Sequence, residues 1–173
     1  MLKKILLFVA AILVLFLIIA ALLPAEYRVE RSITINAPTG KVFEQVVDLN
    51  NYTKWNPWSE ADPEAKTSIS EKNRGVGSVW TWEGEINGKG SLSIIKLEEG
   101  KSIETKAEFF EPMEDVAFGF WQFKNIDNTT KVTWAFEGNL DYPVGRYMSF
   151  FMDDMLGADF EKGLANIKKR SEE

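Results

Sequence analysis

The chain contains neither cysteine nor histidine among its 173 residues. Without cysteine no disulfide can form, so packing must stabilise the fold. The two absences also remove thiol nucleophiles, imidazole bases and the commonest zinc ligands. We therefore predict no catalytic residue, no metal site and no cofactor. An enzyme built from this sequence would have to use carboxylates, lysine, tyrosine or serine without a histidine base.

Charged and polar side chains are missing from residues 5–23, which read ILLFVAAILVLFLIIAALL. Lys3 and Lys4 precede this run, and Pro24 ends it. As a helix the run spans about 28 Å, close to the roughly 30 Å hydrocarbon core of a bilayer. A core helix of a soluble protein would have a polar face, and this segment has none. The sequence predicts a single-pass transmembrane anchor over residues 1–25.

The alternative is a cleaved signal peptide, whose apolar region is typically about 7–15 residues long and ends at a small-x-small cleavage site. The run in this chain is longer, and Leu23 stands where a cut after Ala25 would require a small residue. Lys3 and Lys4 favour a cytoplasmic N-terminus, although Arg28 and Arg31 on the other side oppose that orientation. We predict a membrane protein whose C-terminal domain is extracytoplasmic.

Residues 26–173 have the length of one ordinary domain with its own core. They carry 18 of the basic residues and all 26 acidic residues, which gives a formal charge of −8. Nucleic acid requires a basic surface, and anionic headgroups attract basic clusters. We therefore predict that the domain binds no nucleic acid and does not adhere tightly to anionic lipid. Because its core does not include the anchor, we also expect the domain to be a monomer.

Alternation of apolar and polar residues predicts a first strand over Tyr27–Ile35. Thr39 is the expected N-cap of a helix over 40–48, and NNYTKWNPW at 50–58 predicts a second short helix or turn. Period-two patterning then predicts an antiparallel meander. Its strands are expected at 66–71, 76–86, 90–97, 103–110, 116–124 and 131–139.

The pair Asn87-Gly88 predicts a type I′ hairpin, because both central residues of that turn need positive φ. The chain is expected to end in one long helix over 144–170, which Asp141 and Pro143 introduce. Gly157 and Gly163 each cost about 1 kcal/mol inside a helix, so we expect a close approach or a bend there. An apolar stripe follows the helix: Tyr147, Phe151, Met155, Phe160, Leu164 and Ile167, with Met148 and Met152 beside it.

This order of elements resembles the helix-grip fold of the START-like (SRPBCC) superfamily, in its polyketide cyclase/dehydrase and lipid-transport branch. The segments that carry the resemblance are RSITINAPTGKVFEQVVDLNNYTKWNPW (31–58), GVGSVWTWEGEINGKGSLSI (75–94), TKVTWAFEG (130–138) and FMDDMLGADFEKGLANIKK (151–169). The resemblance implies an α+β domain in which a curved antiparallel sheet of about seven strands wraps the last helix around an apolar cavity. It is weak for activity, because the superfamily includes lipid carriers, hormone receptors and cyclases.

Aromatic and methionine side chains are the candidate ligand-binding residues, because aromatic walls bury large areas and methionine adapts its shape. In the strand 116–124, Ala117, Gly119, Trp121 and Phe123 are expected to face inward; Phe118 and Phe120 then point outward, which conflicts with their apolar character. The same side chains could instead fill a packed core. The ten candidates are Trp80, Trp82, Phe109, Trp121, Phe123, Trp134, Phe136, Met148, Met152 and Met155.

Three hypotheses follow. The first is a membrane-tethered module that binds a lipid or another small hydrophobic molecule and catalyses nothing. The second is a cyclase- or hydrolase-like enzyme, whose first suspects are Tyr142, Tyr147 and Asp153, where the last helix enters the fold. The third is a packed domain that binds a protein partner. Trp55 and Trp58 could form a rim at a cavity mouth or pack a short helix onto the sheet.

Overall fold

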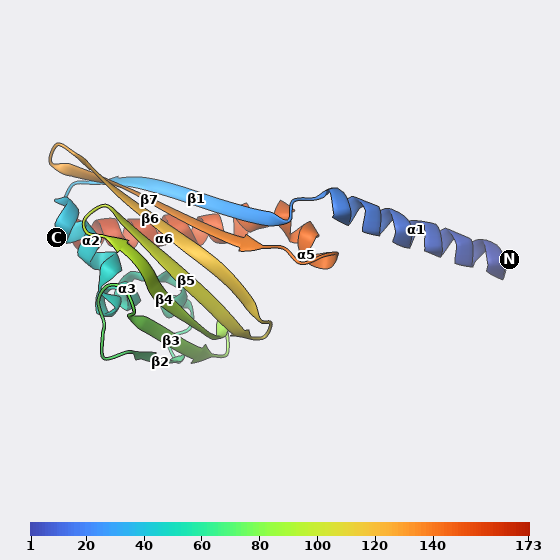
Figure 1. Cartoon of the computed structure of the whole chain (residues 1–173), viewed down its shortest axis with the longest axis horizontal. Helices are drawn as coiled ribbons and strands as arrows, with labels where there is room; N and C mark the ends of the chain where they lie inside the picture. Colours follow the sequence, from blue (N-terminus) through green and yellow to red (C-terminus); the bar gives the residue numbers. More distant parts are fainter.

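A computed structural model describes all residues from 1 to 173. The first helix, α1 (Leu2–Leu22), extends away from the rest of the chain, as Figure 1 shows. It is long and apolar enough to cross a membrane, and almost all of its residues are exposed. The chain from Glu26 onward folds around one core, so α1 contributes little to that core.

One antiparallel sheet of seven strands organises the α+β fold, in the order β1-β7-β6-β5-β4-β3-β2. Its concave face holds the apolar side chains, while Phe118 and Phe120 of β6 point to the uncovered outer face. Two register shifts between β4 and β5 act as bulges, which bend a strand and increase its twist. The strands are β1 (Glu26–Ile35), β2 (Lys66–Ile69), β3 (Val79–Gly84), β4 (Gly88–Glu98), β5 (Ser102–Glu111), β6 (Asp115–Ile126) and β7 (Thr129–Asn139).

Helices cover the concave face of the sheet. The long helix α6 (Met152–Glu172) lies along β1, and three short helices close the other side of the core. The sheet therefore wraps the last helix, which confirms the predicted helix-grip architecture. The short helices are α2 (Thr39–Val47), α3 (Leu49–Trp55) and α4 (Pro57–Ala61).

Two predicted turn details are wrong. Thr39 is not the N-cap of α2; Pro38 has that position, and the Thr39 hydroxyl instead lies 3.1 Å from the Thr130 hydroxyl of β7. The β3–β4 connection is not a type I′ turn on Asn87-Gly88, because only Gly88 has positive φ. The Asp62 carboxylate accepts hydrogen bonds from the backbone N–H groups of Ile86 and Asn87, and these bonds shape a longer loop.

The last helix is not continuous, which corrects the prediction of one helix over 144–170. It consists of α5 (Val144–Tyr147), the 3₁₀ helix η1 (Met148–Phe150) and α6, with a break at Phe151. The physical reason is that the Tyr147 ring stacks on Phe16 of α1, with centroids 4.7 Å apart, so this segment follows α1 and not the core.

The two interior glycines of α6 confirm the expected close approach. A Cβ at Gly157 would lie 2.1 Å from the Arg31 guanidinium, which pairs with Asp153 and Glu161. A Cβ at Gly163 would lie 3.0 Å from the Trp134 ring and 3.2 Å from the Trp55 ring. Both glycines therefore let the helix lie directly on the sheet and on α3.

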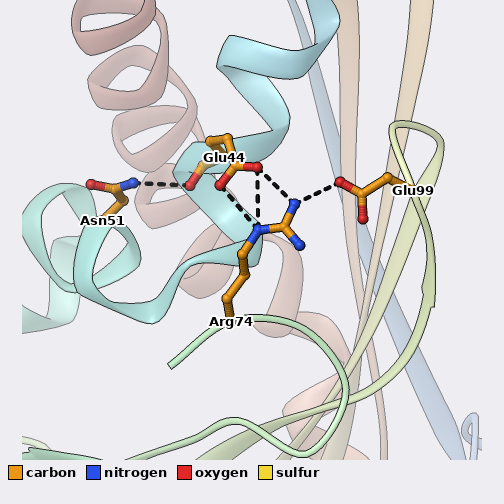
Figure 2. A network of polar contacts seen from close by, with 4 residues as sticks. All are labelled: Glu44, Asn51, Arg74 and Glu99. Carbon is orange, nitrogen blue, oxygen red and sulfur yellow. Dashed lines mark hydrogen bonds and ion pairs between the residues drawn. The ribbon is translucent and has the colours of Figure 1, made fainter. Parts of the chain in front are cut away.

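A polar cluster at the end of the sheet away from α1 joins the short helices to the strands (Figure 2). Arg74, in the loop before β3, donates to Glu44 of α2 at 2.7 Å and to Glu99 of the β4–β5 turn at 2.6 Å. Asn51 of α3 donates to the Glu44 backbone carbonyl at 3.2 Å. Exposed ion pairs of this kind contribute only about 0.2–1 kcal/mol each, so the cluster orients α2 more than it stabilises the fold.

Candidate ligand-binding site

A cavity of about 390 Å³ lies between the concave face of the sheet and helices α3, α4 and α6. Twelve of the 19 residues that line it are hydrophobic. Ligand pockets typically measure about 300–1,000 Å³ and combine an apolar lining with a few polar groups. The fold therefore encloses a space with the size and character of a small-molecule site.

The sheet forms the larger wall of the cavity. Antiparallel register places Trp80 opposite Leu92, and Trp82 opposite Gly90, which in turn pairs with Phe109. A Cβ at Gly90 would lie 2.3 Å from the Trp82 ring and 2.6 Å from the Glu108 carbonyl oxygen. The absence of a side chain at Gly90 therefore lets the Trp82 indole lie flat across the neighbouring strand.

A stack of three rings forms the floor between the sheet and α6. Trp134 of β7 stacks on Trp121 of β6 with centroids 4.4 Å apart, and on Phe160 of α6 with centroids 4.0 Å apart. Trp55 of α3 meets Trp121 and Trp134 edge-on. Such aromatic pairs contribute about 0.5–1.5 kcal/mol beyond their buried area, so this part of the wall is rigid core.

The helices form the opposite wall. Tyr52 of α3, Trp58 of α4 and Leu156 of α6 line it. Trp58 is fixed by a hydrogen bond from its Nε1 to the Asp159 carboxylate at 3.1 Å, whereas Trp55 donates to the Gln45 carbonyl and is buried in the packing. Of the two alternatives for this tryptophan pair, Trp58 therefore borders the cavity and Trp55 packs the short helix onto the sheet.

Few polar groups reach the cavity. Asp62 is buried there, and its Oδ2 accepts from the N–H groups of Ile86 and Asn87 at 2.9 and 3.1 Å. Trp80 Nε1 and Ser59 Oγ are buried without a hydrogen-bond partner in the protein. Burial raises the pKa of the Tyr52 hydroxyl well above its usual range, so this phenol stays neutral. Two residues of the cavity wall, Trp80 and Ser59, thus carry a side-chain hydrogen-bond donor without a partner in the protein.

A comparison with protein-family models identifies the family of this chain. The family model for polyketide cyclase / dehydrase and lipid transport matches residues 26–172. The chain belongs to this family. The match covers the whole domain that follows α1, which agrees with the resemblance carried by the local sequence segments. No curated protein sequence matches the chain significantly.

Solved structures share the fold at low sequence identity. Protein CV1439 from Chromobacterium violaceum is 15% identical, with a TM-score of 0.60 over 87% of this chain and 99% of its own. Protein jhp0584 from Helicobacter pylori is 8% identical, with a TM-score of 0.63 over 84% and 88%. The di-domain ARO/CYC protein BexL of the BE-7585A biosynthetic pathway is 15% identical, with a TM-score of 0.62; the match covers 86% of this chain and 51% of BexL.

The structure places six of the ten candidate residues in the cavity wall: Trp80, Trp82, Phe109, Trp121, Trp134 and Phe136. Four lie elsewhere. Phe123 packs against Phe43 in the core, and Met152 packs against the same core cluster. Met148 and Met155 are exposed beside α1 and at the start of α6. Trp134 contacts α6 at Phe160.

The suspects of the enzyme hypothesis lie outside the cavity. The Tyr142 and Tyr147 hydroxyls donate to the backbone carbonyls of Leu17 and Phe16 in α1. Asp153 pairs with Arg31, whose hydrogen bonds hold the pKa of that carboxyl below its usual range. None of the three is available to a molecule in the cavity.

Residues that the sequence reasoning missed come from the helical wall. Leu156 lies one turn beyond Met152 and takes the place expected for a methionine. Tyr52 and Thr53 line the cavity from α3, just before Trp55. The others lie in α4 and the loop after it, where no periodic pattern marks an inward side: Ser59, Asp62, Pro63 and Ala65.

Proposed function

We propose that this protein binds a lipid or another small hydrophobic molecule in its cavity while α1 anchors it in a membrane. The observation that carries the proposal is the cavity of about 390 Å³, with its aromatic and aliphatic lining. Apolar surface of this extent gains free energy when an apolar ligand replaces water against it. The family description, which includes lipid transport, supports the same class of ligand.

The membrane tether rests on α1, whose 21 residues have the length and composition of a membrane span. We propose that residues 1–25 form a single-pass anchor and residues 26–173 a separate ligand-binding domain. Lys3 and Lys4 favour a cytoplasmic N-terminus and an extracytoplasmic domain.

Reporters fused after Glu173 test this orientation. A reporter that is active only outside the cytoplasm should give a signal. A signal from a reporter that is active only in the cytoplasm would show the opposite orientation.

The polar groups of the cavity favour a neutral ligand with a hydrogen-bond acceptor. Trp80 Nε1 and Ser59 Oγ can each donate a hydrogen bond and have no partner in the protein. Asp62 lines the same cavity, and its carboxylate disfavours an anionic group nearby. An ester, ketone or amide on an aliphatic or aromatic body satisfies both conditions.

The full-length chain, purified in a mild detergent, provides the direct test. Native mass spectrometry should detect one bound apolar molecule, either carried through purification or added from a panel of fatty-acid methyl esters and phospholipids. Absence of any bound molecule across the panel would contradict ligand binding.

A second experiment tests the anchor. The chain should resist carbonate extraction from membranes, because α1 has no polar face. Release into the soluble fraction would contradict the anchor.

Substitution of Trp80 by phenylalanine should weaken the binding of methyl laurate by about three- to tenfold and leave the binding of dodecane unchanged. The reason is that one hydrogen bond contributes about 0.5–1.5 kcal/mol, and an alkane cannot accept one. Titration followed by isothermal calorimetry or by tryptophan fluorescence measures both affinities.

Trp82→Phe is the matched control, because the Trp82 Nε1 already donates to the Asn87 carbonyl at 3.2 Å. Removal of the Trp82 Nε1 donor should not change the preference of the cavity for the ester over the alkane. Equal losses for both ligands in Trp80→Phe would show that Trp80 contributes only apolar surface.

A further inference from the structure

The segment from Tyr142 to Met155 exposes large apolar side chains that nothing else in the domain covers. Val144 is 68% exposed, Phe150 64% and Phe151 55%, although the segment leads directly into the core helix α6. Tyr142, Met148 and Met155 are exposed beside them. A folded domain rarely leaves a contiguous apolar patch of this kind in water, so the patch marks an interaction surface.

This segment is fixed to α1 by four contacts. The hydroxyls of Tyr142 and Tyr147 donate to the carbonyls of Leu17 and Phe16 at 3.1 and 2.7 Å. Arg146 Nη1 donates to the Leu23 carbonyl at 3.0 Å, and the Tyr147 ring stacks on Phe16.

The contacts give the depth of the segment along α1. Leu17 precedes Leu23 by six residues, which corresponds to about 9 Å along a helix. The contacted stretch of α1 belongs to the apolar run itself. If α1 crosses a bilayer, the segment therefore lies at the level of the outer part of one leaflet, where tyrosine and apolar side chains of interfacial segments are buried about 5–10 Å.

The turns of the sheet lie at the same end of the domain. The register places the start of β1 beside the end of β7, and the β5–β6 and β3–β4 turns follow at that end of the neighbouring strands. Figure 1 shows these turns at the end of the sheet from which α1 extends. Their tips carry two more exposed apolar side chains, Met113 at 78% and Ile86 at 70%.

The cavity lies in the half of the domain nearest this end. Phe109 and Phe136 line it close to the ends of β5 and β7, and Leu156 lines it in the first turns of α6. The other half of the core is packed: Ile103 and Val132 are fully buried there and do not line the cavity. The empty space is therefore located between the packed half of the core and the apolar end of the domain.

We propose that residues 142–155, with the β3–β4 and β5–β6 turns, form a docking face that inserts into the headgroup and outer acyl region of the bilayer that α1 crosses. The inference rests on the proposed function. Its consequence is that the cavity exchanges its ligand with that leaflet directly and not through water. Docking is apolar, because the domain carries a formal charge of −8 and gains nothing from anionic headgroups.

The absence of cysteine allows each position to be labelled singly in the full-length chain. Val144→Cys and Phe150→Cys, modified with an environment-sensitive fluorophore, are reconstituted into phosphatidylcholine vesicles that contain doxyl-labelled lipid. We expect the lipid quencher to reduce both signals at least twofold. Ile126→Cys is the control, because Ile126 is exposed at the opposite end of the sheet and should show no quenching. Equal signals at all three positions would overturn the docking face.

A second experiment measures whether the docking face lets the cavity exchange its ligand directly with the leaflet. Phe150→Glu/Phe151→Glu should slow the exchange of a fluorescent fatty-acid methyl ester between the chain and vesicles at least tenfold, while methyl laurate affinity in detergent stays within twofold. Phe118→Glu on the outer face of the sheet is the control and should leave exchange unchanged. Unchanged exchange in the double variant would overturn direct transfer from the leaflet. A wild-type chain that binds no ester would refute ligand binding alone, because the quenching experiment still decides the docking face.

Discussion

Replacement of Trp134 by alanine is expected to lower the free energy of unfolding by roughly 3–5 kcal/mol, the range typical of large aromatic truncations in a core. Trp134 is only 2% exposed, and its two faces stack on Trp121 and Phe160. Although one edge borders the cavity, most of the indole contacts protein atoms, and these contacts are lost in alanine. Urea denaturation of the full-length chain in detergent, followed by circular dichroism, measures the change.

Trp58→Ala is the comparison for this experiment. Trp58 also borders the cavity but is only partly buried, so its truncation should cost clearly less. A loss below about 1 kcal/mol for Trp134→Ala would contradict the stacked arrangement. Because Trp134 also forms part of the wall, ligand affinity should fall in the folded variant; unchanged affinity would place the ligand against other parts of the wall.

Strand periodicity explains why much of the sheet wall could be predicted. Successive residues of a strand point to opposite faces. Once one tryptophan is known to point inward, the face of every other residue in that strand follows. In β6 this rule correctly placed Ala117, Gly119 and Trp121 inward. It also gave the outward positions of Phe118 and Phe120, whose apolar character argued otherwise. The structure resolves that conflict, because no helix covers the outer face and the Arg28 guanidinium lies 5.9 Å from the Phe120 ring centroid.

The helical wall could not be predicted in the same way. Apolar residues at helical spacing look alike whether they face a core, a cavity or a membrane. Met155 belongs to the stripe that continues through Phe160 and Leu164, and Met148 lies beside it, yet both are exposed. Met148 lies before the break at Phe151, in the segment that turns toward α1. The contacts that cause the break join residues more than 120 positions apart in the sequence, which a local pattern cannot reveal.

The loop residues of the cavity illustrate a second limit. Asp62 lies after α4 without any periodic signal, and its position follows from hydrogen bonds to the β3–β4 loop. Because of these bonds, β3 and β4 are joined by a longer loop and not by the type I′ turn that Asn87-Gly88 predicted. A single carboxylate thus shapes both the loop and the cavity, and only the tertiary structure brings the two segments together.

Replacement of Ala107 by phenylalanine is expected to weaken ligand binding at least tenfold, which corresponds to about 1.4 kcal/mol. Ala107 lies on the concave face of β5, opposite Leu92, and lines the cavity. A phenyl ring at this position projects into the empty space and occupies volume that the ligand needs. Native mass spectrometry and fluorescence titration with methyl laurate measure the loss.

The stability of the same variant separates an open cavity from a packed core. An open cavity accepts the added ring, so the free energy of unfolding should change by less than about 1 kcal/mol, whereas overpacking of a filled core costs about 1–3 kcal/mol. Ser93→Phe is the control, because Ser93 lies on the outer face of β4 opposite Lys106 and should leave ligand affinity unchanged. A stable Ala107→Phe variant that binds the ester normally would place the ligand outside the cavity, and a strongly destabilised one would favour the packed domain that binds a protein partner.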